Sequence, residues 1–217
     1  MENVSAKRLQ FGVAILAAGR SQRMGRPKLL LPWSDTSVVG HLVKQWRIAG
    51  ATQIAVVCDL GAVELQNELK RLSVSSANWI FNPQPERGMF SSIQCAARWD
   101  GWLPDLTHFA ITLGDQPHLR QETLGELIAS AKRNPESVCQ PLRNARRRHP
   151  VIFPKRDFFE LRNSEAANLK EFLAKSGTEL AGFESTDAGL EFDMDTLADY
   201  ERLREMFQQA DGKTRSD

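Results

Sequence analysis

The chain has 217 residues, 41% of them hydrophobic, and a formal net charge of +1, which suits one α/β domain that buries about 70% of its unfolded surface. This charge gives no indication of nucleic-acid binding, and no apolar run approaches the ~20 residues of a membrane span. The three cysteines, Cys58, Cys95 and Cys139, are far apart, so we expect small buried side chains in a reducing cytoplasm rather than disulfides or metal ligands.

Strand-like and helix-like patterns alternate along the chain, which predicts a largely parallel sheet. No repeat, linker or low-complexity tract interrupts them, so we expect a single domain over residues 1–217, with frayed tails at about 1–9 and 208–217. Short apolar runs predict strands at 12–16, 54–58, 79–81, 109–113, 137–141 and 151–153. Apolar residues at helical spacing predict helices at 38–49, 62–72, 91–99, 121–133, 169–174 and 197–207.

The most informative segment follows the first predicted strand, where residues 16–28 read Leu-Ala-Ala-Gly-Arg-Ser-Gln-Arg-Met-Gly-Arg-Pro-Lys. Gly19 and Gly25 let the backbone turn sharply and approach a ligand closely, while Arg23 and Lys28 supply positive charge. A strand, a basic glycine-rich loop and a helix are how α/β proteins hold phosphates. Neither the Walker A nor the Gly-x-Gly-x-x-Gly pattern fits. The loop therefore indicates a third kind of nucleotide site or, alternatively, a solvated basic turn.

Two acidic motifs are candidate metal sites. Asp115 follows the predicted strand 109–113, where an unpaired carboxylate is costly. Magnesium prefers oxygen ligands and usually takes one or two carboxylates together with phosphates. Asp193 and Asp195 are two residues apart, and in an extended segment both face the same side. Each motif also has a plainer interpretation, as a turn at 114–115 or as the cap of the helix that follows residue 196.

Four motifs in this order resemble the MobA-like nucleotidyltransferases, most closely their molybdenum cofactor cytidylyltransferase branch. They are the loop at 16–28 with Leu-Leu-Leu-Pro-Trp at 29–33, Asn-Pro at 82–83 with Gly-Met-Phe-Ser-Ser-Ile at 88–93, Leu-Gly-Asp-Gln-Pro at 113–117, and Phe-Asp-Met-Asp-Thr at 192–196. The resemblance covers about 13–203. It implies a three-layer α/β/α Rossmann-like sandwich of the nucleotide-diphospho-sugar transferase type. The mostly parallel, mixed sheet would bind nucleotide at the carboxyl ends of its strands.

The resemblance also implies a reaction, in which a substrate phosphate attacks a nucleoside triphosphate and pyrophosphate leaves. Both reactants are anions, so catalysis rests on positioning and electrostatics. Lys28 is then the expected catalytic cation, with Arg23 as the second, and Asp115 the expected catalytic carboxylate. Magnesium would be held by Asp115 and Asp195, with Asp193 in support.

For the nucleotide, the resemblance implies CTP rather than GTP, because Ala17 and Ala18 precede Gly19. Asn82-Pro83 is also a plain turn signal. The nucleotide-binding residues that we expect are Leu16, Ala17, Ala18, Gly19, Arg23, Lys28, Asn82, Gly88 and Ser92.

The acceptor half departs from the family pattern. The branch usually has Gly before His-Pro-Val, whereas Arg148 precedes His149 here, and residues 163–168 lack the glycines and the arginine of the usual Gly-Asp-x-Gly-Ala-Arg segment. The basic run either binds an acceptor phosphate or forms a solvated loop, and we expect His149 to be structural. The candidate acceptor-binding residues are Arg146, Arg147 and Arg148.

These expectations combine into a cytoplasmic, magnesium-dependent enzyme that transfers CMP from CTP to a molybdopterin-type cofactor. A molybdoenzyme is a possible protein partner, and we expect neither nucleic acid nor membrane as a partner. Two alternatives stay open. One is a nucleotidyltransferase acting on a sugar or polyol phosphate, and the other is a non-catalytic cofactor carrier or insertion chaperone.

Overall fold

The computed structural model describes residues 9–19 and 24–214, the last seven by their backbone alone. The strands of its main sheet are β1 (Phe11–Leu16), β4 (Gln53–Asp59), β5 (Trp79–Asn82), β6 (His108–Leu113), β7 (Val138–Arg143), β8 (Arg146–Arg147), β9 (Val151–Pro154) and β10 (Leu180–Glu184). Their order is β10-β7-β9-β6-β1-β4-β5, with β8 beside β7. A separate two-stranded sheet is formed by β2 (Pro32–Trp33) and β3 (Thr36–Ser37).

The direction of the strands decides where their loops meet. Strand β1 pairs in parallel with β4 and β6, β4 pairs in parallel with β5, and β10 pairs in parallel with β7. Strand β9 is antiparallel to both β6 and β7. The carboxyl ends of β1, β4, β5, β6, β7 and β10 therefore lie at one edge of the sheet, and the chain entering β9 arrives at the same edge.

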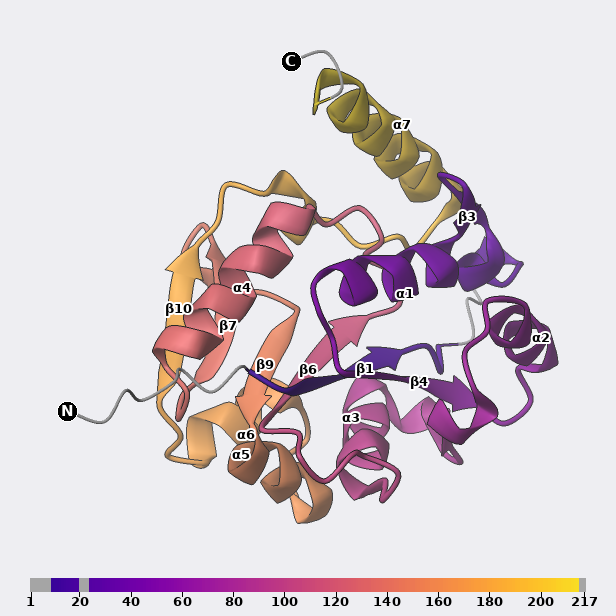
Figure 1. Cartoon of the computed structure of the whole chain (residues 1–217). Coiled ribbons are helices and arrows are strands. Elements are labelled where there is room, and N and C mark those ends of the chain that lie inside the picture. The colour runs from indigo at the N-terminus through magenta and orange to yellow at the C-terminus, as the bar shows by residue number, and fades with distance from the viewer. Residues whose placement is uncertain (1–8, 20–23, 215–217) are drawn as a thin grey trace.

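Helices cover both faces of this sheet (Figure 1). One face carries α1 (Val38–Ile48), α2 (Val63–Arg71) and α4 (Gln121–Arg133), and the other carries α3 (Met89–Arg98), α5 (Lys155–Glu160) and α6 (Leu169–Lys175). The last helix, α7 (Leu197–Thr214), extends outward from the body. Its first turns are held by Tyr200, whose hydroxyl donates to the carbonyl of Pro32 at 2.6 Å.

The core follows the alternation of side chains along the strands. In β1, Val13 and Ile15 pack into the cluster below α1, α2 and α4, while Ala14 packs into the cluster below α3, α5 and α6. This central strand is therefore apolar on both faces, with β-branched side chains on one and the small Ala14 on the other, as expected for a sheet covered on both sides.

The predicted three-layer α/β/α sandwich with a mostly parallel, mixed sheet is confirmed. Helix α5, the edge strand β10 and the two-residue strands β2, β3 and β8 were not predicted. Helix α7 continues to Thr214, so backbone helix covers most of the stretch expected to fray at the C-terminus. Residues 1–8 and 215–217 lie outside the described residues.

Candidate active site

Lys28 joins three of the sequence motifs. It begins the 3₁₀ helix η2 (Lys28–Leu30), which the buried side chain of Leu29 anchors to the core. Its ammonium donates to Oδ2 of Asp115 at 2.7 Å and to the carbonyl of Met194 at 3.2 Å, and it lies 3.6 Å from Oδ1 of Asp195. Two carboxylates from distant parts of the chain therefore share one partly buried cation.

Asp115 owes its position to the glycine before it. The amide of Gly114 donates to the carbonyl of Leu16 at 3.0 Å, so the loops after β1 and β6 are in direct contact. A Cβ atom on Gly114 would lie 2.7 Å from that same oxygen. The close approach of the two loops therefore requires a residue without a side chain.

A cavity of about 240 Å³ opens beside this ion pair, at the carboxyl edge of the sheet. The first turn of α3 contributes to it, after Gly88 adopts φ +85°, a conformation that favours glycine. Helix N-termini attract phosphate groups. Of the expected nucleotide-binding residues, the ones that line this cavity are Leu16, Ala17, Ala18, Gly19, Lys28, Gly88 and Ser92.

The two remaining nucleotide candidates differ from these. Asn82 is buried and does not line the cavity; its side-chain amide donates to the hydroxyls of Ser91 and Ser92 at 2.8 and 2.9 Å. These two hydrogen bonds fix the first turn of α3 to the end of β5. Arg23 lies outside the described residues.

The two distal aspartates have different partners. Oδ1 of Asp193 accepts from the side-chain amide of Gln116 at 3.0 Å, whereas Asp195 faces Lys28. The cap of α7 is formed by Thr196, whose hydroxyl accepts from the amide of Asp199 at 3.2 Å. Asp195 is therefore not the residue that caps this helix.

Oxygen ligands for a divalent cation are limited in number here. Among the residues that the structure describes, no group of three or more His, Cys, Asp or Glu side chains is placed to hold a metal. The carboxylates of Asp115 and Asp195 both contact the ammonium of Lys28, and together they offer two hard oxygen donors. This donor set fits magnesium, which commonly completes its coordination with water and substrate phosphates.

The basic run lines a second cavity of about 720 Å³. Arg146 and Arg147 form the exposed strand β8, and the buried Nε of Arg148 has no hydrogen-bond partner among the described residues. Helix α6 closes the opposite side with Asn168, Lys170 and apolar side chains. Met89 lines both this cavity and the nucleotide cavity, so the two adjoin.

His149 also lines the second cavity. Removal from water lowers its pKa to about 4, although the backbone of Ile111 and the charge of Asp115 act in the opposite direction. The imidazole is therefore neutral near pH 7. It adds a polar but uncharged group to the cavity that the arginines line, a placement that its sequence position beside Pro150 did not indicate.

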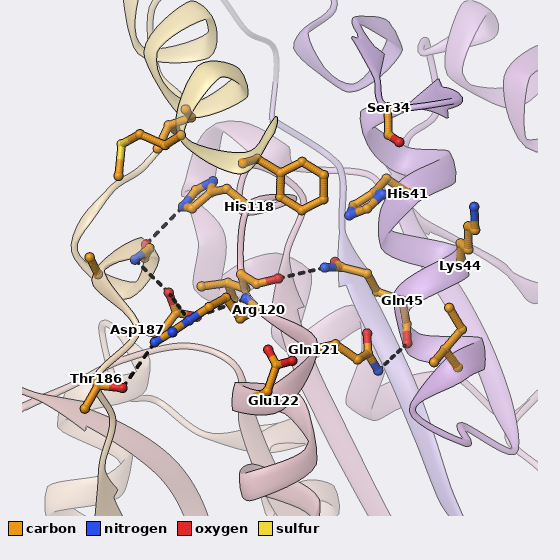
Figure 2. A pocket seen from close by; sticks show the side chains of 17 residues that line it. Ser34, His41, Lys44, Gln45, His118, Arg120, Gln121, Glu122, Thr186 and Asp187 are labelled. Carbon is orange, nitrogen blue, oxygen red and sulfur yellow. Dashed lines mark hydrogen bonds and ion pairs between the residues drawn. The ribbon is translucent and has the colours of Figure 1, made fainter. Parts of the chain in front are cut away.

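A third cavity, of about 530 Å³, lies outside the Asp115 loop, between α1, α7, the start of α4 and the 3₁₀ helix η6 (Ala188–Glu191). Figure 2 shows that His41 and Gln45 come from α1 and face His118 and Arg120 across it. None of the site residues expected from the sequence lines this cavity.

The family model of the MobA-like NTP transferase domain matches residues 13–180. The chain belongs to this family. The match contains the basic loop, the Gly88 segment and Asp115, so the resemblance drawn from these motifs is confirmed.

Two curated relatives are similar to this chain. The molybdenum cofactor cytidylyltransferase of Escherichia coli (strain K12) is 24% identical to this chain, covering 89% of the chain and 95% of the relative. The bifunctional protein GlmU of Prochlorococcus marinus (strain MIT 9211) is 32% identical over 131 residues, covering 59% of this chain and 28% of the relative. The chain thus spans little more than a quarter of the length of that second relative.

Two solved structures share the fold. A nucleotidyl transferase from Methanothermobacter thermautotroptrophicus has a TM-score of 0.75 at 23% identity, covering 93% of this chain and 99% of that one. The Rv0371c protein of Mycobacterium tuberculosis H37Rv, in complex with manganese, has a TM-score of 0.66 at 23% identity, covering 90% and 98%. No helix within the described ranges is long and apolar enough to cross a bilayer.

Proposed function

We propose that this protein is a nucleotidyltransferase that transfers CMP from CTP to a phosphorylated acceptor and releases pyrophosphate. The observation that carries the proposal is the ammonium of Lys28 between Asp115 and Asp195, directly beside the nucleotide cavity. A reaction between two anions needs cations and fixed geometry more than it needs a base. The site combines a tethered cation with two carboxylates suited to a divalent one.

Magnesium would be held by Asp115 and Asp195, and when bound it would neutralise oxygens of the triphosphate. Asp193 would act in support, because its carboxylate is engaged with Gln116. A manganese complex of the structurally similar mycobacterial protein supports a divalent ion in this fold. We place Arg23 beside the triphosphate on the sequence motif alone.

Lys28 would contact the triphosphate as a compact point charge. It is already held by Asp115, Asp195 and the carbonyl of Met194, so its position does not depend on a bound nucleotide. Electrostatic groups that are fixed before the reaction cost no reorganisation when charge develops.

CTP is favoured for two reasons. The small side chains of Ala17 and Ala18 line the nucleotide cavity, and the relative matched over most of both chains is named a cytidylyltransferase. The same relative supports a molybdopterin-type acceptor. Such an acceptor would bind in the second cavity, where Arg146, Arg147 and Arg148 offer charge for its phosphate and α6 offers an apolar wall.

A sugar or polyol phosphate is the alternative acceptor, since the charges of Arg146, Arg147 and Arg148 would bind the phosphate of either class. A non-catalytic carrier is disfavoured, because a carrier has no need for a cation shared between two carboxylates.

A panel of acceptors tests these possibilities. Molybdopterin, a sugar phosphate and a polyol phosphate are incubated with labelled CTP or GTP, and products are identified by mass spectrometry. We expect a cytidylylated molybdopterin and one equivalent of pyrophosphate. Guanylylated products only would overturn the CTP assignment, and absence of pyrophosphate with every acceptor would favour the carrier.

A further inference from the structure

The loop that carries Asp115 is fastened to the segment that carries Asp195 by side chains that lie outside the nucleotide cavity. These side chains border the third cavity, where Figure 2 shows Arg120 reaching Asp187 and Thr186, and His118 reaching the backbone after Asp187. The two segments are 64 to 77 residues apart in sequence at their side-chain contacts. Tertiary contacts alone hold them together.

Asp187 is the most buried group of this set, with 2% of its surface exposed. Its Oδ2 accepts from the amide of Arg120 at 2.9 Å and from the hydroxyl of Thr123 at 2.7 Å, and its Oδ1 accepts from the amide of Gly189 at 2.9 Å. The guanidinium of Arg120 lies 3.5 Å from Oδ1. A buried carboxylate is tolerated only with such partners, and removing it leaves them unsatisfied.

His118 makes the next contact along the two segments. Its Nε2 donates to the carbonyl of Gly189 at 2.9 Å. A carbonyl oxygen can only accept, so this contact requires the proton on Nε2, and burial lowers the pKa of His118. A Cβ atom on Gly189 would lie 3.0 Å from both Asp187 and the His118 ring, which shows how tightly the two side chains enclose this glycine.

The contacts form an ordered series. Thr123 and Arg120 meet Asp187, His118 meets Gly189, Gln116 meets Asp193, and Asp115 and Asp195 then share Lys28. Residue numbers fall along the Asp115 loop while they rise along the distal segment, so the two segments run antiparallel toward Lys28. Each contact therefore limits which residues of the two segments can meet at the next one.

We propose that Asp187 is a positioning residue that fixes the distance between the Asp115 and Asp195 carboxylates. It acts through Gly189 and the backbone that leads to Asp193 and touches neither cavity where substrates bind. Magnesium demands nearly ideal octahedral geometry, so a small shift of one carboxylate weakens the site. This role rests on the proposed function of Asp115 and Asp195 as metal ligands.

The test replaces Asp187 and measures both the segment and the metal. In D187N we expect faster hydrogen exchange over 188–196 with unchanged exchange in β1 and β6. We also expect at least a tenfold weaker affinity for Mn²⁺ by electron paramagnetic resonance. Turnover of D187N should be lower than that of the wild type at limiting Mn²⁺, and excess Mn²⁺ should restore part of it. A general loss of stability would not be reversed in this way.

Two substitutions of Thr123 provide a second test if D187N does not fold. T123V removes the hydroxyl that donates to Asp187 and should weaken Mn²⁺ binding several-fold, whereas T123S keeps it and should bind as the wild type does. A folded D187N, or T123V, with wild-type exchange and Mn²⁺ affinity would overturn the positioning role. Wild-type protein that binds no Mn²⁺ and transfers no nucleotide would instead overturn the proposed function, and with it this role.

Discussion

Lys28 illustrates how much one side chain contributes when several segments converge on it. Its side chain is only 14% exposed, and its ammonium lies within 3.6 Å of both carboxylates. In K28A we expect turnover to fall on the order of a hundredfold or more, as when a fixed electrostatic stabiliser is removed. Pyrophosphate release measures this, with K28R as the control that keeps the charge. Wild-type release in folded K28A would remove Lys28 from the catalytic site.

Gly114 allows a second prediction at the residue scale. Because its Cβ would lie 2.7 Å from the carbonyl of Leu16, G114A should destabilise the protein by about 1–3 kcal/mol, the usual cost of overpacking. Gly125 in α4 is exposed, and apart from its chain neighbours and the backbone of its own helix, no atom of the described residues lies within 4 Å of the position that a methyl group would take there, so G125A should stabilise by up to ~1 kcal/mol. Urea unfolding compares the two, and equal effects would contradict the steric argument.

At the scale of elements, the sequence predicted those with strong periodicity. Strands β1, β4 and β6 are continuous apolar runs, and buried parallel strands have this pattern. Strand β10 was missed because it is an edge strand with no buried residue, so no alternation is visible in it. The antiparallel direction of β9 was equally hidden, since its apolar pattern is the same whichever way it runs.

The candidate site divides in the same way. Lys28 and Asp115 follow local signals, a glycine-rich loop and a strand end. The separation of Asp193 from Asp195 was not predictable, because the segment 192–196 belongs to no strand and Gln116 binds one of the two. Asp187 makes a local turn contact with the amide of Gly189, but this pattern does not indicate Arg120 and Thr123 as partners, because they are more than 60 residues away.

The short strand β8 gives a prediction for the acceptor. Replacing Arg146, Arg147 and Arg148 together by Ser should raise the acceptor KM about tenfold, since each of these charges contributes roughly 0.5 kcal/mol. The KM for CTP should barely move, because Lys28 lies in the other cavity. Added salt should reproduce part of the effect, as exposed charges are screened beyond ~10 Å.

Steady-state kinetics with each substrate varied in turn make this measurement. If neither constant changes, the run is a solvated loop and the acceptor is held elsewhere. If both rise together, the two cavities do not act as separate halves.

For the whole molecule, histidines set the response to acid. Loss of contact with water lowers the pKa of His149 from 6.5 to about 4, and burial also lowers the pKa of His108 and of His118. The unfolded chain therefore binds more protons than the folded chain between these values. The free energy of unfolding should rise with pH across this window and fall on acidification, by up to ~1.4 kcal/mol per pH unit for His149.

Urea unfolding at pH 7, 6 and 5 checks this dependence. H149Q removes one contributor and should flatten the slope. A stability that increases as the pH falls from 7 to 5 would contradict the assignment of these imidazoles as neutral.

The ion pair of Lys28 has a consequence for how ligands enter the site. If Asp115 and Asp195 hold the divalent ion, that ion lies close to the tethered ammonium of Lys28, and a triphosphate supplies the negative charge that offsets both cations. Nucleotide and metal then strengthen each other's binding by the same factor, because linkage between two ligands is reciprocal. Calorimetry would register this as a CTP affinity that rises with Mg²⁺ concentration. The charge of Lys28 thus couples the affinity for the metal to the affinity for the nucleotide.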